Sequence, residues 1–167
     1  MYLDISFRQA LLFSGLISSS LLASAISFEF FYDLVPCKLC IWQRWPHVII
    51  VVVMLLGLSM PNNTWILLLI SLSAIVTGII GFYHTGVEQG WWSGPLGCSN
   101  QFGSETDISN LTTLLLETPI VKCDEIVWSL FNISMAGWNS LVSFFIAIFS
   151  FFSWVHIINK KKWYNTN

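Results

Sequence analysis

The stretch Pro36-Cys37-Lys38-Leu39-Cys40-Ile41-Trp42-Gln43-Arg44 lies where one long apolar segment ends and the next begins. Two cysteines separated by two residues can close a small disulfide ring, and such pairs often carry a thiol with a lowered pKa. We expect Cys40 to fall in the first turn of the following helix, where the positive end of the helix dipole favours a thiolate. Arg44 follows one turn later on the same helix face and adds a full positive charge. The stretch therefore predicts a redox-active thiolate at a membrane surface, beside a cation.

The composition indicates a membrane protein. The chain has 167 residues, of which 55% are hydrophobic and 10% are charged, whereas a soluble domain carries about 25% charged residues. The net charge of −2 does not favour a nucleic-acid partner. The apolar run after Arg8 resembles a signal peptide, but it ends at Glu29 without a small-residue cleavage site, so we interpret it as a retained helix.

Four uncharged runs have the length of a transmembrane helix, which needs about 20 residues to cross a hydrocarbon core of about 30 Å. The 43 residues between Arg44 and Glu88 contain no Asp, Glu, Lys or Arg, and the turn-forming Pro61-Asn62-Asn63 divides them into two spans. The predicted spans are about 9–28, 42–60, 64–83 and 138–158. We therefore predict an all-α membrane protein, a four-transmembrane-helix bundle forming a single domain over residues 1–167.

The distribution of charge predicts how this bundle is oriented. Four spans put both termini on one side, where the basic residues Arg8 and Lys160 to Lys162 outnumber the single acid, Asp4. An excess of Lys and Arg marks the cytoplasmic side. We therefore expect cytoplasmic termini, with the loops at about 29–41 and 84–137 facing outward. Residues 107–117 have leucines and isoleucine at helical spacing and predict a short amphipathic helix, which lies in the membrane interface or packs on the bundle.

The outward loops carry all four cysteines, Cys37, Cys40, Cys98 and Cys123. An even number fits an oxidising compartment or a redox enzyme. A structural zinc site would need all four as ligands, but the 24 residues between Cys98 and Cys123 are unlike a zinc knuckle, so we predict no metal site. The CxxC favours a redox centre over a structural bridge. For Cys98 and Cys123, a structural disulfide and a pair that relays electrons by thiol–disulfide exchange remain equally open.

The segment PCKLCIWQR resembles the PCxLCxxQR signature of the disulfide bond formation protein B (DsbB) family, bacterial inner-membrane thiol–quinone oxidoreductases. Phe82-Tyr83-His84-Thr85 is similar to the Tyr-x-His-Thr-like end of the family's third span. Cys98 and Cys123 match its loop cysteines, and the stretch from Cys123 to Trp138 resembles the entry into its fourth span. The resemblance covers roughly residues 10–158 in the same order.

The resemblance implies a relay of cysteine pairs. A reduced periplasmic thioredoxin-fold oxidase (DsbA-like) is expected to attack a Cys98–Cys123 disulfide at Cys98. The Cys37–Cys40 disulfide then reoxidises the loop pair and passes two electrons to a membrane quinone, either ubiquinone or menaquinone. The location implied is the bacterial inner membrane, multi-pass, with both termini cytoplasmic and the cysteine loops periplasmic.

Three residues are implied to meet the quinone. Cys40 faces the ring, Arg44 binds a carbonyl oxygen, and His84 is a contact or proton donor. From the residues alone, Arg44 is also explained as a basic residue that reaches to the interface from a helix end. His84 is likewise explained as an interfacial histidine bonded to backbone.

Two other classes of protein share some of these features. A vitamin-K-epoxide-reductase-like oxidoreductase also combines a four-helix bundle, a CxxC and a quinone, but its active CxxC lies near the last spans, whereas here it follows the first. A non-enzymatic membrane protein with two structural disulfides is the second alternative. It predicts that Cys37→Ser lowers stability and that no quinone reaction exists.

Overall fold

The computed structural model describes residues 6–60, 63–95 and 122–166. These residues form the helices α1 (Phe7–Tyr32), α2 (Lys38–Ser59), α3 (Trp65–Glu88) and α5 (Met135–Thr166), and the short strands β1 (Ser129–Leu130) and β2 (Ile133–Ser134). Each of the four helices is long and apolar enough to cross a membrane. The predicted all-α four-helix membrane bundle is therefore confirmed. The amphipathic helix predicted at 107–117 and the loop cysteine Cys98 lie outside the described residues.

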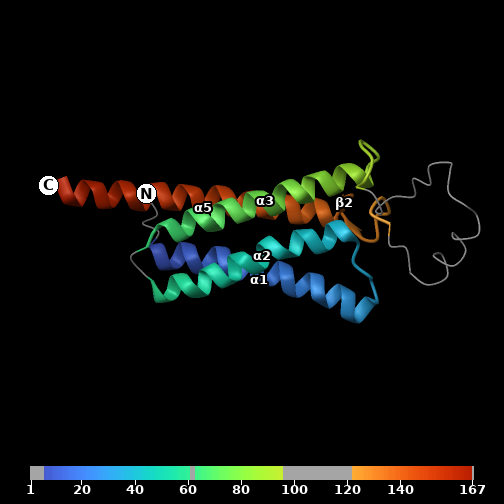
Figure 1. The fold of residues 1–167 in the computed structure, drawn as a ribbon, viewed down its shortest axis with the longest axis horizontal. Helices are drawn as coiled ribbons and strands as arrows, with labels where there is room; N and C mark the ends of the chain where they lie inside the picture. Colours follow the sequence, from blue (N-terminus) through green and yellow to red (C-terminus); the bar gives the residue numbers. More distant parts are fainter. Residues whose placement is uncertain (1–5, 61–62, 96–121, 167) are drawn as a thin grey trace, which may run out of the picture.

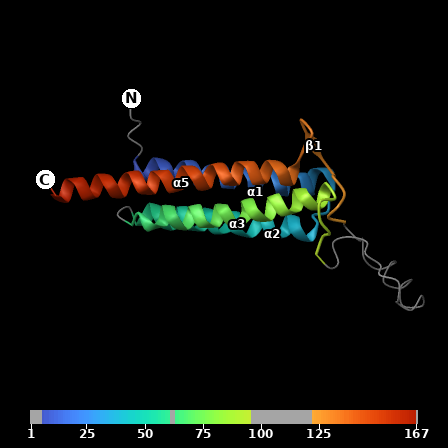
Figure 2. The same ribbon diagram turned by 90° about the horizontal axis from the view of Figure 1, so that it is seen from above.

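The helices form a closed bundle in which α1 packs on α2, α2 on α3, α3 on α5, and α5 on α1. The start of α1 and the end of α5 lie at one end of the bundle, and α5 extends past the other helices there (Figure 1). The start of α2, the end of α3 and the β-hairpin lie together at the opposite end (Figures 1 and 2). This end holds the CxxC motif.

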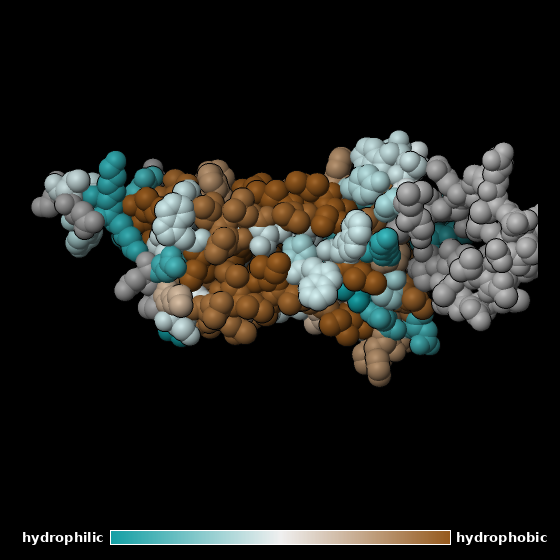
Figure 3. Space-filling view, in the orientation of Figure 1, coloured by the Kyte–Doolittle hydropathy of each residue, from teal (hydrophilic) through white to brown (hydrophobic). Residues whose placement is uncertain are grey.

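The outer face of the bundle is apolar along its length. Large hydrophobic side chains are exposed on all four helices, among them Leu16, Ile49, Leu72 and Ile148. Figure 3 shows the hydrophobic residues as a continuous band in the middle of the molecule, with the hydrophilic residues towards the two ends. A surface of this kind is suited to lipid rather than water, so the chain is a multi-pass membrane protein.

Hydrogen bonds between small polar side chains join the helices inside the bundle. The Ser14 and Ser150 hydroxyls lie 2.9 Å apart between α1 and α5, and Ser140 donates to the Gly78 carbonyl at 2.9 Å between α5 and α3. Gly81 allows α3 and α5 to approach closely, because a Cβ there would lie 3.1 Å from the Ala136 carbonyl oxygen. Small and hydroxylated residues commonly hold transmembrane helices together in this way.

The short loop between α1 and α2 supplies the residues that cap both helix ends. Asp33 ends α1 in the left-handed conformation, with φ of 50°. Cys37 is the N-cap of α2, and the helix begins at Lys38, earlier than the uncharged run predicted from residue 42. Cys40 therefore lies within the first turn of α2, as the sequence predicted.

The β-hairpin before α5 was not predicted. Its turn residues Phe131 and Asn132 both have positive φ, 53° and 62°, which is the backbone pattern of a type I′ turn. Phenylalanine is unusual in that conformation, and this is why the sequence gives no hairpin signal. The Trp138 indole of α5 donates to the Leu130 carbonyl at 3.2 Å, which holds the hairpin against the end of the bundle.

Candidate active site

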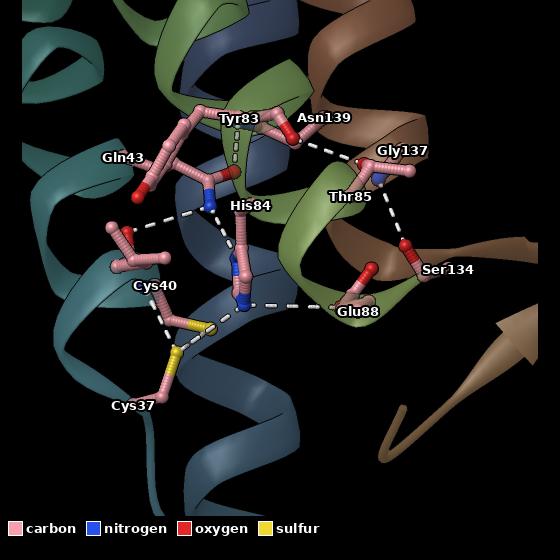
Figure 4. Close-up of polar contacts among 12 residues, drawn as sticks. Cys37, Cys40, Gln43, Tyr83, His84, Thr85, Glu88, Ser134, Gly137 and Asn139 are labelled. Carbon is pink, nitrogen blue, oxygen red and sulfur yellow. Dashed lines mark hydrogen bonds and ion pairs between the residues drawn. The ribbon is translucent and has the colours of Figure 1, made fainter. Parts of the chain in front are cut away.

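Cys37 and Cys40 form a hydrogen-bonded pair of thiols at the start of α2 (Figure 4). The Cys37 sulfur accepts the Cys40 backbone N–H at 3.2 Å, and the two sulfurs lie 3.1 Å apart, within hydrogen-bonding distance. Both residues are free cysteines, so the structure describes the dithiol form of the motif. The predicted Cys37–Cys40 disulfide would be the oxidised form of the same pair and stays a prediction.

The negative charge of this dithiol falls on Cys37. The hydrogen bond from the Cys40 thiol, with smaller contributions from His84 and the Cys40 N–H, lowers the pKa of Cys37 to about 4, although burial of the sulfur opposes this. The sequence placed the thiolate on Cys40 instead. The difference arises because the N-cap position collects the hydrogen bonds of the helix start, whereas the first-turn thiol acts as a donor to it.

His84 reaches the pair from α3. Its Nε2 lies 3.5 Å from the Cys37 sulfur, and its Nδ1 lies 2.8 Å from the Gln43 side-chain nitrogen (Figure 4). An amide nitrogen can only donate, so Nδ1 is the acceptor and the ring proton is on Nε2. The imidazole N–H is therefore directed at the Cys37 sulfur.

Gln43 is itself held by a chain of buried hydrogen bonds across three helices. The Asn139 amide of α5 donates to Gln43 Oε1 at 2.7 Å, and Asn139 Oδ1 lies 2.9 Å from His47 Nε2. His47 Nδ1 in turn lies 3.1 Å from the Ser18 hydroxyl of α1. The hydrogen bonds all run in one direction: each group donates to the next, in the order Ser18, His47, Asn139, Gln43, His84 and the Cys37 sulfur. This network fixes the orientation of both histidines and of both amides.

The network was missed from sequence. Its members are uncharged polar residues inside predicted spans, and polar residues within a membrane are a recognised signal of function. That signal marks Gln43, His47 and Asn139 individually. It does not show that they meet, because they come from two helices whose rotation is set by packing.

Arg44 lies beside the motif, as predicted, and forms an ion pair that the sequence did not predict. Its guanidinium lies 2.5 Å from the Glu29 carboxylate of α1, and it also donates to the Ala25 carbonyl at 3.4 Å. Arg44 and Cys40 line the same cavity. The positive charge is therefore next to the dithiol but partly balanced by Glu29.

Glu88 at the end of α3 is a further charged group at the site. Its Oε1 lies 3.8 Å from His84 Nε2, and its side chain is 6% exposed. Its other oxygen, Oε2, is buried and has no hydrogen-bond partner among residues 6–60, 63–95 and 122–166. The sequence assigned no role to this residue.

A cavity of about 430 Å³ opens beside the dithiol, between α1, α2, the hairpin and the start of α5. Polar and ionisable side chains form part of its lining, including Cys37, Cys40, Arg44, His84 and Glu88. Apolar side chains line the rest, including Leu21, Leu22, Phe28, Val127, Leu130 and Met135. A mostly apolar cavity with a few converging polar groups is the usual form of a small-molecule site.

Cys123 lies against the CxxC. It is fully buried and belongs to one apolar cluster with Cys37, Leu39 and Val87, against which Cys40 also packs. Cys123 is disulfide-bonded, and its predicted partner, Cys98, lies outside the described residues. The fold thus brings three of the four predicted cysteines to one place.

A membrane bundle that buries a CxxC dithiol beside a histidine, against a further cysteine and next to an apolar cavity, is a membrane thiol oxidoreductase. The family profile described as "Disulfide bond formation protein DsbB" matches residues 7–153. The chain therefore belongs to the DsbB family of disulfide bond formation proteins, which confirms the resemblance seen in the sequence.

Two relatives illustrate this similarity. The disulfide bond formation protein B of Psychromonas ingrahamii is 29% identical over 151 residues, which cover 86% of this chain and 80% of the relative. The uncharacterized protein RP370 of Rickettsia prowazekii is 26% identical over 136 residues, which cover 80% of this chain and 79% of that protein.

Proposed function

We propose that this protein is a protein-dithiol:quinone oxidoreductase. It reoxidises a periplasmic DsbA-like thioredoxin-fold oxidase and passes two electrons, through two cysteine pairs, to a quinone of the membrane. Membership of the DsbB family supports the general activity, disulfide bond formation. The observation that carries the finer proposal is the cavity, because it brings the CxxC dithiol, Arg44 and His84 to the wall of an apolar space.

The residues around the cavity fit a quinone. Its volume of about 430 Å³ is within the range of about 300–1,000 Å³ that is usual for small-molecule sites. Arg44 offers N–H donors suited to a carbonyl oxygen, His84 lines the same cavity as a contact for the ring, and Cys40 would face the ring. Leu21 and Leu22 form part of an apolar wall on α1 that suits an isoprenoid tail. When bound, the quinone supplies an acceptor for two electrons and two protons.

The first half of the relay is thiol–disulfide exchange. A thiolate of the partner attacks Cys98 in the Cys98–Cys123 disulfide, forms a mixed disulfide and releases Cys123 as a thiolate. The partner's second thiol then displaces Cys98, so the partner leaves oxidised and the loop pair is reduced. Exchange with the Cys37–Cys40 disulfide reoxidises the loop pair and moves two electrons to the CxxC. The packing of Cys123 in one cluster with Cys37 supports this exchange.

The second half is oxidation of the CxxC dithiol. Before this step Cys37 is the thiolate and Cys40 holds the proton that the two sulfurs share. Closing the Cys37–Cys40 bond releases that proton and two electrons, and a second proton from water completes the quinol. His84 Nε2–H stabilises the Cys37 thiolate by hydrogen bonding. Arg44 supplies positive charge where negative charge develops on an oxygen of the acceptor.

We place the dithiol end of the bundle at the periplasmic face of a bacterial inner membrane and both termini in the cytoplasm. The basic residues Lys160 to Lys162 lie at the end of α5, at the far end of the bundle from the cysteines (Figure 1). This arrangement agrees with the excess of basic residues expected on the cytoplasmic side.

Anaerobic incubation of the purified protein with quinone and a reduced thioredoxin-fold partner tests the proposal, with quinol formation followed by absorbance. We expect one quinol per partner disulfide, and no quinol with Cys40→Ser. Ser14→Ala is the matched control, because it removes a buried hydrogen bond in the bundle and leaves the site intact. Full activity of Cys40→Ser, or a wild-type protein that never reduces quinone, would contradict the proposal.

A further inference from the structure

Three ligand-bearing side chains converge at the dithiol, and Glu88 lies next to one of them, His84. The Cys37 sulfur, the Cys40 sulfur and His84 Nε2 all lie within 4.8 Å of one another. The two sulfurs are 3.1 Å apart, the Cys37 sulfur is 3.5 Å from His84 Nε2, and Glu88 Oε1 is 3.8 Å from the same nitrogen (Figure 4). In a tetrahedral zinc site, with Zn–S of about 2.3 Å and Zn–N of about 2.0 Å, neighbouring ligand atoms are about 3.3–3.8 Å apart. The Cys37–Cys40 and Cys37–His84 pairs are already close to that spacing.

Glu88 adds an independent observation. Within the part of the chain that the structure describes, its Oε2 is buried without a hydrogen-bond partner, and a buried carboxylate oxygen without a partner is costly. The two long basic side chains that line the cavity do not serve it, because Arg44 pairs with Glu29 and Lys122 pairs with Glu125. A cation held between the sulfurs, His84 and Glu88 would satisfy this carboxylate.

We propose that the dithiol form of the site binds one thiophilic divalent cation, such as Zn²⁺, through Cys37, Cys40, His84 and Glu88. Binding replaces the thiol proton of the dithiol with the metal. Coordination by His84 Nε2 also moves the ring proton from Nε2 to Nδ1, with the side-chain amides of Gln43 and Asn139 turned so that Gln43 Oε1 accepts it. The Cys37–Cys40 disulfide offers no thiolate ligands, so the site exists in one redox state only. This set of ligands differs from the all-cysteine zinc site considered from the sequence, which would have required Cys98 and Cys123.

A metal bound here would hold the pair reduced, because both sulfur lone pairs needed to close the disulfide would be shared with the cation. The consequence is reversible inhibition of electron transfer out of the dithiol. This consequence rests on the proposed function. Metal binding itself does not, since it requires only the geometry of the reduced site.

Cobalt(II) is the probe for binding. We expect reduced, detergent-purified protein to bind one Co²⁺, with a thiolate-to-cobalt charge-transfer band in the near ultraviolet and the strong visible bands of tetrahedral Co²⁺. Zn²⁺ should displace it, and protein with an oxidised CxxC should show no band. A Cys98→Ser/Cys123→Ser variant, whose remaining cysteines are those of the motif, should retain the spectrum. Circular dichroism checks that this variant is folded.

Two carboxylate variants separate this site from chelation by the cysteines alone. Glu88→Gln should weaken Co²⁺ binding by about tenfold or more, since loss of even an outer contact typically reduces metal affinity about 10- to 100-fold. Glu125→Gln is the matched control. Glu125 lines the same cavity but pairs with Lys122, so this variant should bind Co²⁺ like wild type. No band in reduced protein, an equal band in oxidised protein, or wild-type affinity in Glu88→Gln would overturn the proposal.

The inhibition is measured in the quinol assay. Stoichiometric Zn²⁺ should stop quinol formation, and a chelator should restore it. If metal-free protein binds Co²⁺ as described but reduces no quinone, the proposed function fails and the metal site stands. If quinol formation proceeds normally with the site saturated by Zn²⁺, or if no cobalt spectrum develops, the present inference fails and the proposed function stands.

Discussion

The Gln43 side-chain nitrogen lies 2.8 Å from His84 Nδ1, and this contact decides which imidazole nitrogen carries the proton. Because the amide donates to Nδ1, the proton stays on Nε2, which faces the Cys37 sulfur at 3.5 Å. Gln43 touches neither sulfur through its side chain. It is therefore a positioning residue that acts through His84.

Gln43→Leu should slow the oxidation of the dithiol by quinone. The variant leaves His84 Nδ1 without its donor, so the ring can take the other tautomer and the hydrogen bond to the Cys37 thiolate is lost. A hydrogen bond to a charged group is worth about 1.5–3 kcal/mol, so the rate should fall roughly 10- to 100-fold. Stopped-flow measurement of quinol formation from pre-reduced protein gives this rate.

If Gln43 had only a structural role, Gln43→Leu would lower the stability of the protein without slowing the oxidation of the dithiol. Ser14→Ala is again the control, because it removes a buried interhelical hydrogen bond of the same bundle. The pH dependence of the rate should also shift in Gln43→Leu and stay fixed in Ser14→Ala. Equal rates and equal pH profiles for Gln43→Leu and wild type would show that His84 needs no partner on Nδ1.

Arg44→Met should raise the apparent Michaelis constant for quinone about tenfold, the effect of losing about 1.4 kcal/mol of binding. The Arg44 guanidinium lines the cavity next to Cys40, so its loss removes a donor for a carbonyl oxygen. The Michaelis constant for the thiol partner should stay the same, because the partner is expected to attack the loop pair. Steady-state kinetics with each substrate varied in turn separates the two constants.

Glu29→Gln tests whether the ion pair with Arg44 matters to that result. The pair is partly exposed, so it contributes little to stability. Removing the carboxylate frees the guanidinium, and the Michaelis constant for quinone should fall or stay the same. An unchanged constant in Arg44→Met would instead identify Arg44 as a residue that only anchors the end of α2.

Much of this site was predictable, and the parts that were not share a physical reason. The positions of the helices could be predicted from the long runs without charged residues, because lipid tolerates few charges, and from Pro61, which divides the longest run. The sequence could predict that the CxxC, Arg44 and His84 lie close together. The CxxC and Arg44 are neighbours in sequence, and His84 lies at the end of a span on the same side of the membrane. The contact between Gln43 and Asn139 depends on how α2 and α5 are rotated, which hydropathy does not specify.

The position of the thiolate is the main local difference between the prediction and the structure. Helix-dipole reasoning favoured Cys40 because it lies in the first turn. In the structure Cys37 occupies the N-cap, where its sulfur accepts the Cys40 N–H, and hydrogen bonding with the Cys40 thiol lowers the pKa of Cys37. An exact helix boundary was needed to choose between the two cysteines, and boundaries are the least certain part of any prediction from sequence.

Cys37 in the reduced protein should react with iodoacetamide at unusually low pH. Its pKa of about 4 means that the thiolate is populated from about pH 5 upwards, whereas an ordinary thiol reaches this state near 8.5. The alkylation rate at Cys37, located by peptide mass, should therefore be nearly constant above about pH 5 and should fall below it. Cys40→Ala removes the main cause of the lowered pKa, so its alkylation midpoint should move to higher pH. A midpoint in wild type near that of a free thiol would contradict the assignment of the charge to Cys37.

Cys123→Ser should trap the partner on the protein. In the proposed relay the partner's thiolate attacks Cys98, and Cys123 is the thiol that leaves. Because serine cannot form a disulfide, Cys98 in this variant stays available, and oxidised partner should accumulate as a mixed disulfide with it. A non-reducing gel should show a band at the summed mass, which a reductant abolishes.

Cys98→Ser is the matched control and should give no such band, since Cys123 is fully buried and inaccessible to a partner. A band of equal strength in Cys98→Ser would place the first attack on Cys123 instead, and no band in either variant would contradict exchange at the loop pair.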